Sequence, residues 1–211
     1  MIAEPSHNCP LCPRLAAFRK ANRKAEPDWF NGPVAIFGSA SAELLIVGLA
    51  PGLRGANRTG RPFTGDYAGD LLYATLKEFG FAHGEYQARP DDGLRLVNAR
   101  IANAVRCVPP QNKPTPAEIN TCRRFLAGAM EQTKEMQAIV ALGKIAHDSV
   151  VRTLNGKLAH YKFAHGAKHE IAGYTLFDSY HCSRYNTNTG VLTPKMFRAV
   201  FADVKKYLEK K

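Results

Sequence analysis

The sequence has no long apolar run and comparatively few acidic residues. No stretch reaches the roughly 18 apolar residues that a membrane span requires, and the first residues lack the basic and apolar regions of a signal peptide. We therefore expect an intracellular protein with no membrane partner. Lys and Arg total 29 against 18 Asp and Glu, which gives a formal charge of +11 and a pI of about 9.6. Because phosphate binding releases counterions, this excess modestly favours nucleic acid as a partner over an ordinary solvated basic surface.

Several common motifs are also missing. Neither a P-loop nor Gly-x-Gly-x-x-Gly is present, which argues against a nucleotide-binding enzyme. There is no internal repeat and no low-complexity segment, and five cysteines in a reducing compartment argue against a disulfide framework. A chain of 211 residues can bury one sizeable core. We therefore expect a single domain, residues 1–211, that acts as a monomer.

The most informative stretch covers residues 44–70. It starts with an apolar run from Leu44 to Val47, which is typical of a buried parallel strand. A long loop rich in glycine and proline follows, and loops of this length in compact domains are usually functional. A helical pattern resumes near residue 67, so the loop lies at the carboxyl end of a strand, where open α/β sheets bind ligands. Among its side chains, the candidates for binding or chemistry are Arg58, Arg61, Phe63 and Asp66.

Hydrophobic periodicity and capping signals predict alternating strands and helices. Strands are expected at 44–47, 94–105, 138–142 and 175–180, and helices at 14–24, 67–80, 115 onward, 144–154 and 193 onward. This order predicts an α/β fold of three layers, α/β/α, with a central four-stranded parallel sheet. The segment 157–169 is basic and rich in histidine, and we interpret its histidines as surface residues rather than metal ligands.

Four of the cysteines occur in two groups along the sequence, Cys9-x2-Cys12 and Cys107-x14-Cys122. Four thiolates suit either structural zinc or an iron–sulfur cluster. The alternative is a set of unrelated buried cysteines, which are common in protein cores. Cys9 and Cys12 lie in a proline-rich turn, a poor place for core residues, so the pattern favours a metal without choosing which.

Three segments resemble a known family. Gly48–Gly52 together with Gly55–Asp66 closely resembles the first motif of the uracil-DNA glycosylase superfamily, and more narrowly of the family 5 (type B) iron–sulfur glycosylases of bacteria and archaea. Asn103–Cys107 resembles the family's uracil-reading strand end, and His181–Ser183 resembles its final motif, usually His-Pro-Ser. The cysteine spacing matches the [4Fe–4S] ligands of families 4 and 5. The resemblance extends from Cys9 to about Gly190.

The resemblance implies a uracil-DNA glycosylase-like fold and a DNA repair enzyme. Such an enzyme flips a damaged base out of DNA and hydrolyses its N-glycosidic bond, which leaves an abasic site. The catalytic residues would be Asp66, which activates water, and His181, which stabilises the departing base. Asp66 also precedes a helix, so it can serve as an N-cap instead or as well. In the base pocket, Phe63 would stack on the base and Asn103 would pair with uracil O4 and N3–H.

The remaining implied contacts involve backbone, DNA and cofactor. Backbone groups at Gly48, Ala50 and Gly52 would hold the base, and the DNA-binding residues would be Arg58, Arg61, Arg184 and Tyr185. A structural [4Fe–4S] cluster would be held by Cys9, Cys12, Cys107 and Cys122, with zinc in the same thiolates as the alternative. The expected partner is damaged DNA, double-stranded and also single-stranded. The expected location is the prokaryotic cytoplasm, in association with the nucleoid.

Departures from the superfamily pattern add further expectations. Ala50 stands where many members have a carboxylate or Asn, and the less polar pocket predicts activity on hypoxanthine or xanthine besides uracil. The loop of residues 48–66, which we call the reactive loop, has no Lys to form a Schiff base, so the glycosylase should be monofunctional. Cys182 replaces the usual Pro, and its role stays open. The alternative function is a non-catalytic or covalent uracil-DNA-binding protein of the same fold, although Gly52–Gly65 lacks the nucleophilic His of such relatives.

Overall fold

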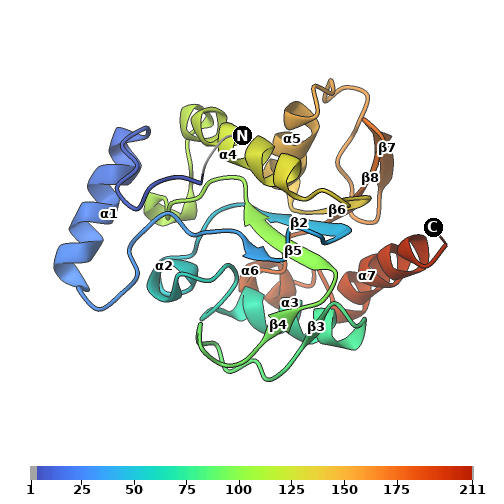
Figure 1. Ribbon diagram of the computed structural model, residues 1–211, viewed down its shortest axis with the longest axis horizontal. Helices are drawn as coiled ribbons and strands as arrows, with labels where there is room; N and C mark the ends of the chain where they lie inside the picture. The colour runs from blue at the N-terminus through green and yellow to red at the C-terminus, as the bar shows by residue number, and fades with distance from the viewer. Residues whose placement is uncertain (1–3, 211) are drawn as a thin grey trace.

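A computed structural model describes residues 4–210 as a central sheet between two layers of helices (Figure 1). The main sheet has six strands in the order β1-β5-β2-β6-β8-β7. Its strands are β1 (Phe37–Gly38), β2 (Leu44–Gly48), β5 (Ala99–Asn103), β6 (Ala138–Leu142), β7 (Lys168–Ile171) and β8 (Tyr174–Ser179), and a small second sheet pairs β3 (Ala82–His83) with β4 (Arg95–Leu96). The helices are α1 (Pro13–Ala25), α2 (Ala56–Thr59), α3 (Tyr67–Glu78), α4 (Pro116–Gln132), α5 (Lys144–Thr153), α6 (Arg184–Asn188) and α7 (Pro194–Leu208).

The predicted fold class is confirmed, and two edge strands extend the expected sheet. The four strands β5, β2, β6 and β8 are parallel, and nearly all of their residues are buried. Antiparallel β1 and β7 flank them. β7 has no clear strand signal in the sequence, because only Ile171 of its Lys-His-Glu-Ile segment is buried. β7 turns into β8 through Ala172 and Gly173, whose positive φ angles of 50° and 85° are those of a tight hairpin turn.

The predicted strand 94–105 is two strands separated by a bend. β4 ends at Leu96 and β5 begins at Ala99, and between them Asn98 has a φ of 50°. The Asn98 side chain accepts a hydrogen bond from the Glu43 backbone N–H at 2.8 Å. Asn tolerates this left-handed backbone better than most residues, so one strand prediction covered two short elements.

The helices divide between the two faces of the sheet, as Figure 1 shows. On one face α3 and α7 pack against the sheet through Leu72, Leu76, Phe197 and Phe201. On the other face α4 and α5 pack through Leu126, Val150 and Val151. The predicted capping box of α4 is present, since Thr115 and Glu118 each accept the other's backbone N–H.

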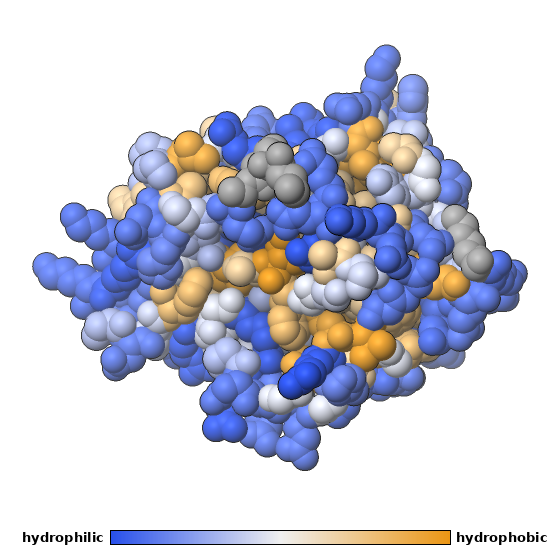
Figure 2. Space-filling view, in the orientation of Figure 1, coloured by the Kyte–Doolittle hydropathy of each residue, from blue (hydrophilic) through white to orange (hydrophobic). Residues whose placement is uncertain are grey.

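The order in which the parallel strands are added to the sheet changes direction at β2, and such a switch point is where a ligand site is expected. From β2 the chain crosses to β5 on one side, and later strands continue through β6 to β8 on the other. A crevice forms at the carboxyl end of strands at such a point. None of the helices described is long and apolar enough to cross a bilayer. The face seen in Figure 2 is mostly hydrophilic, with hydrophobic residues gathered mainly toward its middle.

Candidate active site

A pocket of about 710 Å³ opens at the carboxyl ends of β2, β5 and β8. It is lined by residues from each predicted motif, namely Ala50, Gly52, Phe63, Asp66, Asn103 and His181. Gly48 lies directly beside them, since a Cβ on it would be 2.5 Å from Asn103 Oδ1 and 2.6 Å from the Phe63 ring. The structure therefore brings all the predicted catalytic and base-contacting residues together. Because Gly48 has no Cβ, the Asn103 amide and the Phe63 ring can both lie against its backbone.

The two carboxylate oxygens of Asp66 face different groups. Oδ1 accepts the Gly69 backbone N–H at 3.3 Å, so Asp66 is the N-cap of α3. Oδ2 lies over the loop, where a Cβ would be 2.8 Å away on Gly52 and 2.2 Å away on Gly55. Burial raises the pKa of Asp66, and hydrogen bonds from Gly69 and Ala68 oppose that shift. Oδ1 therefore caps the helix, while Oδ2 faces the loop residues that line the pocket.

Two tyrosines hold the backbone on either side of the Phe63 ring. Phe63 has a φ of 51°, a left-handed conformation that costs an ordinary residue roughly 1 kcal/mol or more. The Tyr86 hydroxyl donates to the Phe63 carbonyl at 3.2 Å, and the Tyr73 hydroxyl donates to the Pro62 carbonyl at 2.6 Å. These bonds offset the backbone strain and direct the ring into the pocket wall.

Arg61 is buried, which contradicts its predicted role as a phosphate contact. Its guanidinium makes two bonds of 2.8 Å to Asp92, and its Nε donates to Thr64 Oγ1 at 2.7 Å. Only 5% of Arg61 is exposed, so DNA cannot reach the charge. Burial by itself would raise the pKa of Asp92, but bonds from Arg61 and two backbone N–H groups hold it well below its usual value. Arg61 therefore fastens the reactive loop to residues 84–94.

Asn103 and His181 each carry a buried polar atom without a hydrogen-bond partner. These atoms are Asn103 Oδ1, at the end of β5, and His181 Nδ1, just after β8. Burial lowers the pKa of His181 to about 4, so its imidazole is neutral above that pH. Its ring stacks on Phe63, with 5.9 Å between centroids and 27° between planes. Buried polar atoms are rarely left unpaired in native proteins, so both atoms point to a ligand that supplies their partners.

The segment after His181 separates a core residue from exposed ones. Cys182 is fully buried and its Sγ lies 3.5 Å from the Ala68 carbonyl, so it packs the final motif against α3. Arg184 and Tyr185 begin the short helix α6 and are exposed, Tyr185 to 74%. Arg184 lines the pocket mouth, with its guanidinium 5.6 Å from the Tyr67 ring. Arg58 is exposed on the loop, which leaves it accessible to a phosphate.

One small cavity lies between α1, α4 and the segment that follows β5, and it is lined by the thiols of Cys9, Cys12, Cys107 and Cys122. Two buried arginines contact them, since Arg19 Nη1 donates to Cys107 Sγ at 3.2 Å and the Arg106 backbone N–H donates to Cys122 Sγ at 3.3 Å. Arg19 Nε and Arg106 Nη1 have no partner of their own. The Arg106 guanidinium is already paired with the Glu4 carboxylate and donates to the Val34 carbonyl, so Arg19 is the buried cation whose charge thiolates in this cavity would compensate.

Comparison with known proteins decides the family. Residues 35–205 match the model of the uracil DNA glycosylase superfamily. The chain belongs to that superfamily. A type-5 uracil-DNA glycosylase of Thermus thermophilus is 42% identical over 205 residues, which covers 94% of this chain and 93% of that protein. Type-5 proteins of Mycobacterium leprae and Pyrobaculum aerophilum are 43% and 38% identical over 94% and 88% of this chain, and over 90% and 83% of their own lengths. The resemblance to family 5 is therefore confirmed.

Within this uracil-DNA glycosylase superfamily member, the sequence analysis missed several residues that shape the site. Arg54 also lines the pocket, and its place between Gly52 and Gly55 in the first motif was the available signal. Tyr86 and Asp92 support the reactive loop from more than twenty residues away. They lie in a segment with no motif, so nothing in the sequence pattern pointed to them.

Proposed function

We propose that the protein is a uracil-DNA glycosylase that flips a deaminated base into the pocket and hydrolyses its N-glycosidic bond. The names of the type-5 relatives support this activity. The observation that carries it is the pair of unpartnered polar atoms, Asn103 Oδ1 and His181 Nδ1, buried in one pocket. Both atoms would gain partners from the polar edge of a base.

Recognition follows from the Asn103 amide. Uracil presents an N–H beside a carbonyl, which pairs with the acceptor Oδ1 and the donor Nδ2 of Asn103. Hypoxanthine and xanthine present the same N–H and carbonyl pair, whereas cytosine and adenine present the reverse. A buried site that hydrogen-bonds its substrate can reject the wrong pattern by orders of magnitude. Since Ala50 keeps the 710 Å³ pocket open, we propose that it also accepts the two deaminated purines.

Catalysis would use Asp66 and His181. Asp66 Oδ2 would orient and deprotonate water and stabilise positive charge on the sugar, while Oδ1 stays on the Gly69 N–H. Neutral His181 would donate one hydrogen bond to the base oxygen on which negative charge develops. Phe63 would stack on the flipped base. No lysine is among the described residues that line the pocket, which supports a monofunctional glycosylase without Schiff-base chemistry.

DNA would contact exposed charges that line the pocket, Arg54 and Arg184, and a further exposed charge on α2, Arg58. Arg54, Arg58 and Arg184 are candidates for phosphate contacts, and Tyr185 for the wedge that fills the gap left by the flipped base. The proposed substrates are damaged double-stranded and single-stranded DNA, bound by a monomer. Arg61 takes no part, because its guanidinium is engaged with Asp92.

We also propose that Cys9, Cys12, Cys107 and Cys122 hold a [4Fe–4S] cluster. Two observations fit this group. The buried Arg19 guanidinium would balance part of the negative charge of a thiolate-bound cluster, and the Arg106 backbone N–H donates to Cys122 Sγ. Among the described residues, no three of the cysteine sulfurs all lie within 4.8 Å of one another. One zinc ion would need sulfurs about 3.8 Å apart, given Zn–S bonds of about 2.3 Å. When bound, the cluster would link the N-terminal segment covalently to α4.

The test is base release from matched oligonucleotides that carry uracil, hypoxanthine or xanthine. Wild type should leave abasic sites that alkali cleaves, and Asp66→Ala should not. Asp70→Ala is the matched control, because this exposed carboxylate of α3 lies four residues further along and should be dispensable. Tight binding of uracil-DNA by wild type without release would reject the glycosylase and favour a non-catalytic or covalent binding protein.

A further inference from the structure

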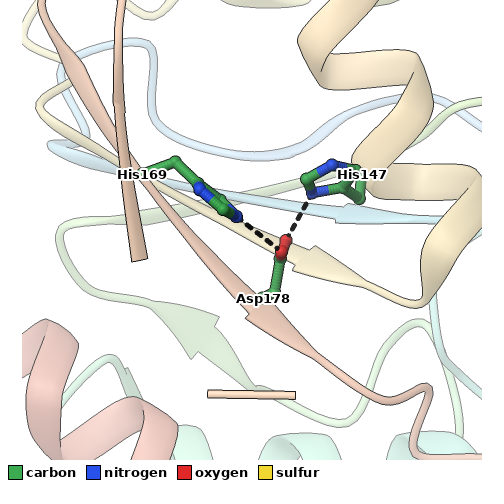
Figure 3. A group of neighbouring side chains, drawn as sticks. All are labelled: His147, His169 and Asp178. Atoms are coloured by element: carbon green, nitrogen blue, oxygen red, sulfur yellow. Dashed lines mark hydrogen bonds and ion pairs between the residues drawn. The ribbon is translucent and has the colours of Figure 1, made fainter. Parts of the chain in front are cut away.

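His147, Asp178 and His169 form a cluster that is largely buried and does not line the pocket. Asp178 nevertheless precedes His181 by only three residues. His147 comes from α5 and His169 from β7, and both point toward the Asp178 carboxylate on β8 (Figure 3). The side chains of Asp178 and His147 are 0% and 1% exposed. A carboxylate this deeply buried requires a paired cation and hydrogen bonds to offset the loss of its hydration.

The hydrogen bonds determine the charge on His147. Its Nε2 lies 2.8 Å from the Tyr161 carbonyl oxygen, which only accepts, so Nε2 carries a proton. Its Nδ1 lies 2.8 Å from Asp178 Oδ1, and the other carboxylate oxygen is 3.2 Å from His169 Nε2. An ionised Asp178 accepts from both rings, which requires a proton on His147 Nδ1 as well. His147 is then an imidazolium paired with a buried carboxylate, and the pKa of His147 is raised accordingly, against the effect of burial.

The cluster fastens the segment 157–167 over the end of β8. His147 holds it at the Tyr161 carbonyl, and Phe163 packs on the His147 ring with centroids 5.5 Å apart. The backbone of Asp178 bonds the same segment twice, to Gly166 and to Ala167, each at 2.9 Å. Each bond therefore connects the segment either to α5 or to β8.

That segment in turn contacts the residue before His181. His165 Nδ1 accepts the Tyr180 backbone N–H at 3.1 Å, and the two rings lie 5.1 Å apart. Phe163 also faces Tyr180, at 6.0 Å between centroids. A continuous set of contacts thus runs from His147 through Tyr161 and His165 to the peptide that carries His181.

We propose that His147 is a positioning residue for His181, held as an imidazolium between Asp178 and the Tyr161 carbonyl so that the 157–167 segment fixes the end of β8. This proposal rests on the proposed role of His181 in base release. The three ligand atoms are also close enough for a metal ion, but each has a hydrogen-bond partner within the cluster, and none of the three side chains has an unpartnered buried atom. The direct ion pair therefore accounts for the cluster by itself.

The protonation state is tested by ¹⁵N NMR of histidine-labelled protein, which does not depend on activity. Near neutral pH both ring nitrogens of His147 should be protonated, and the signals should disappear in His147→Gln. The groups that face this ring are Asp178, His169, the Tyr161 carbonyl and, along α5, Asp148. A ring with one bare nitrogen, or a stoichiometric zinc ion whose removal by a chelator shifts these signals, would overturn the proposal.

The positioning role is tested by kinetics and by the His181 signals. In His147→Gln, kcat for base release should fall about 10- to 100-fold with little change in KM for DNA, and the His181 ring signals should shift. His169→Gln is the matched control, since it removes a partner of Asp178 but keeps the bond to Tyr161, and it should leave His181 nearly unchanged.

A second variant guards against a folding defect. His165→Phe keeps a ring beside Tyr180 but removes the acceptor of its N–H, so it should reproduce both the kcat loss and the His181 shift. Unchanged His181 signals and kcat in both variants would reject the positioning role. If wild type releases no base at all, the proposed function fails, and the NMR result on His147 still stands or falls by itself.

Discussion

At the residue scale, Asp66 shows how one side chain can meet two demands. Its Oδ1 caps α3 and its Oδ2 faces the glycine loop, where Gly52 and Gly55 have no Cβ that would collide with it. The glycines are therefore required by the carboxylate as much as by the turn. Gly-Asp before a helix indicated the cap, which the structure shows on Oδ1, and the family motif indicated the catalytic role, which we propose for Oδ2.

The raised pKa of Asp66 predicts how the rate of base release falls at acid pH. Burial raises its pKa above the usual 3.8, so the carboxylate is lost, and base release falls, at a higher pH than an exposed Asp would cause. His181 stays neutral until the pH approaches its value of about 4. Single-turnover rates across pH should show this limb in wild type, whereas Asp66→Asn should be slower by about 10²-fold or more and should lack it.

The same variant separates the two roles of Asp66. Asn is a good N-cap, so Asp66→Asn should keep its thermal stability, while Asp66→Ala should lose about 1 kcal/mol. An Asp66→Asn protein that keeps the wild-type acid limb would show that another group controls it.

At the element scale, the reactive loop depends on a segment that the sequence analysis left unassigned. Residues 84–94 supply Tyr86 and Asp92, which hold the Phe63 carbonyl and the Arg61 guanidinium. The Phe63 backbone is in a conformation that the loop would not adopt by itself. The small β3–β4 sheet that bounds this segment is thus part of the support for the site.

Breaking the Arg61–Asp92 pair should destabilise the protein strongly. In Asp92→Asn the buried guanidinium loses its counter-charge, which typically costs about 3–5 kcal/mol. Asp148→Asn is the control, since its pair with Lys144 is exposed and should contribute about 0–1 kcal/mol. Urea unfolding measures both. Equal losses in the two variants would mean that Arg61 finds another partner.

At the scale of the whole molecule, the four cysteines join parts of the chain that are far apart in sequence. Cys9 and Cys12 precede α1, Cys107 follows β5 and Cys122 lies on α4. The buried Arg19 guanidinium donates to Cys107 Sγ, and its Nε has no partner among the described residues. A bound cluster would therefore stabilise the attachment of the N-terminal segment to the sheet.

Removing one cysteine should separate this role from ordinary packing. Cys107→Ser should abolish stoichiometric iron and its visible absorption and should lower the melting temperature, because metal binding is coupled to folding. Cys182→Ser is the matched control, a buried cysteine outside the cavity, and should retain iron. Iron and sulfide analysis of protein purified without oxygen makes the measurement. Zinc in place of iron would support the alternative metal.

Features that depend on local order along the chain can be predicted from the sequence. Apolar runs specified the parallel strands β2 and β6, since strands covered on both faces carry no alternating pattern. Proline and capping residues specified the starts of α4 and α7, and the motifs located the pocket residues. The tertiary structure decided the features that depend on distant partners. It buried Arg61 against Asp92, set His147 between Asp178 and Tyr161, and gathered the four cysteines around one cavity. The physical reason is that charge, burial and protonation depend on neighbours in space, and these neighbours lie tens of residues away along the chain.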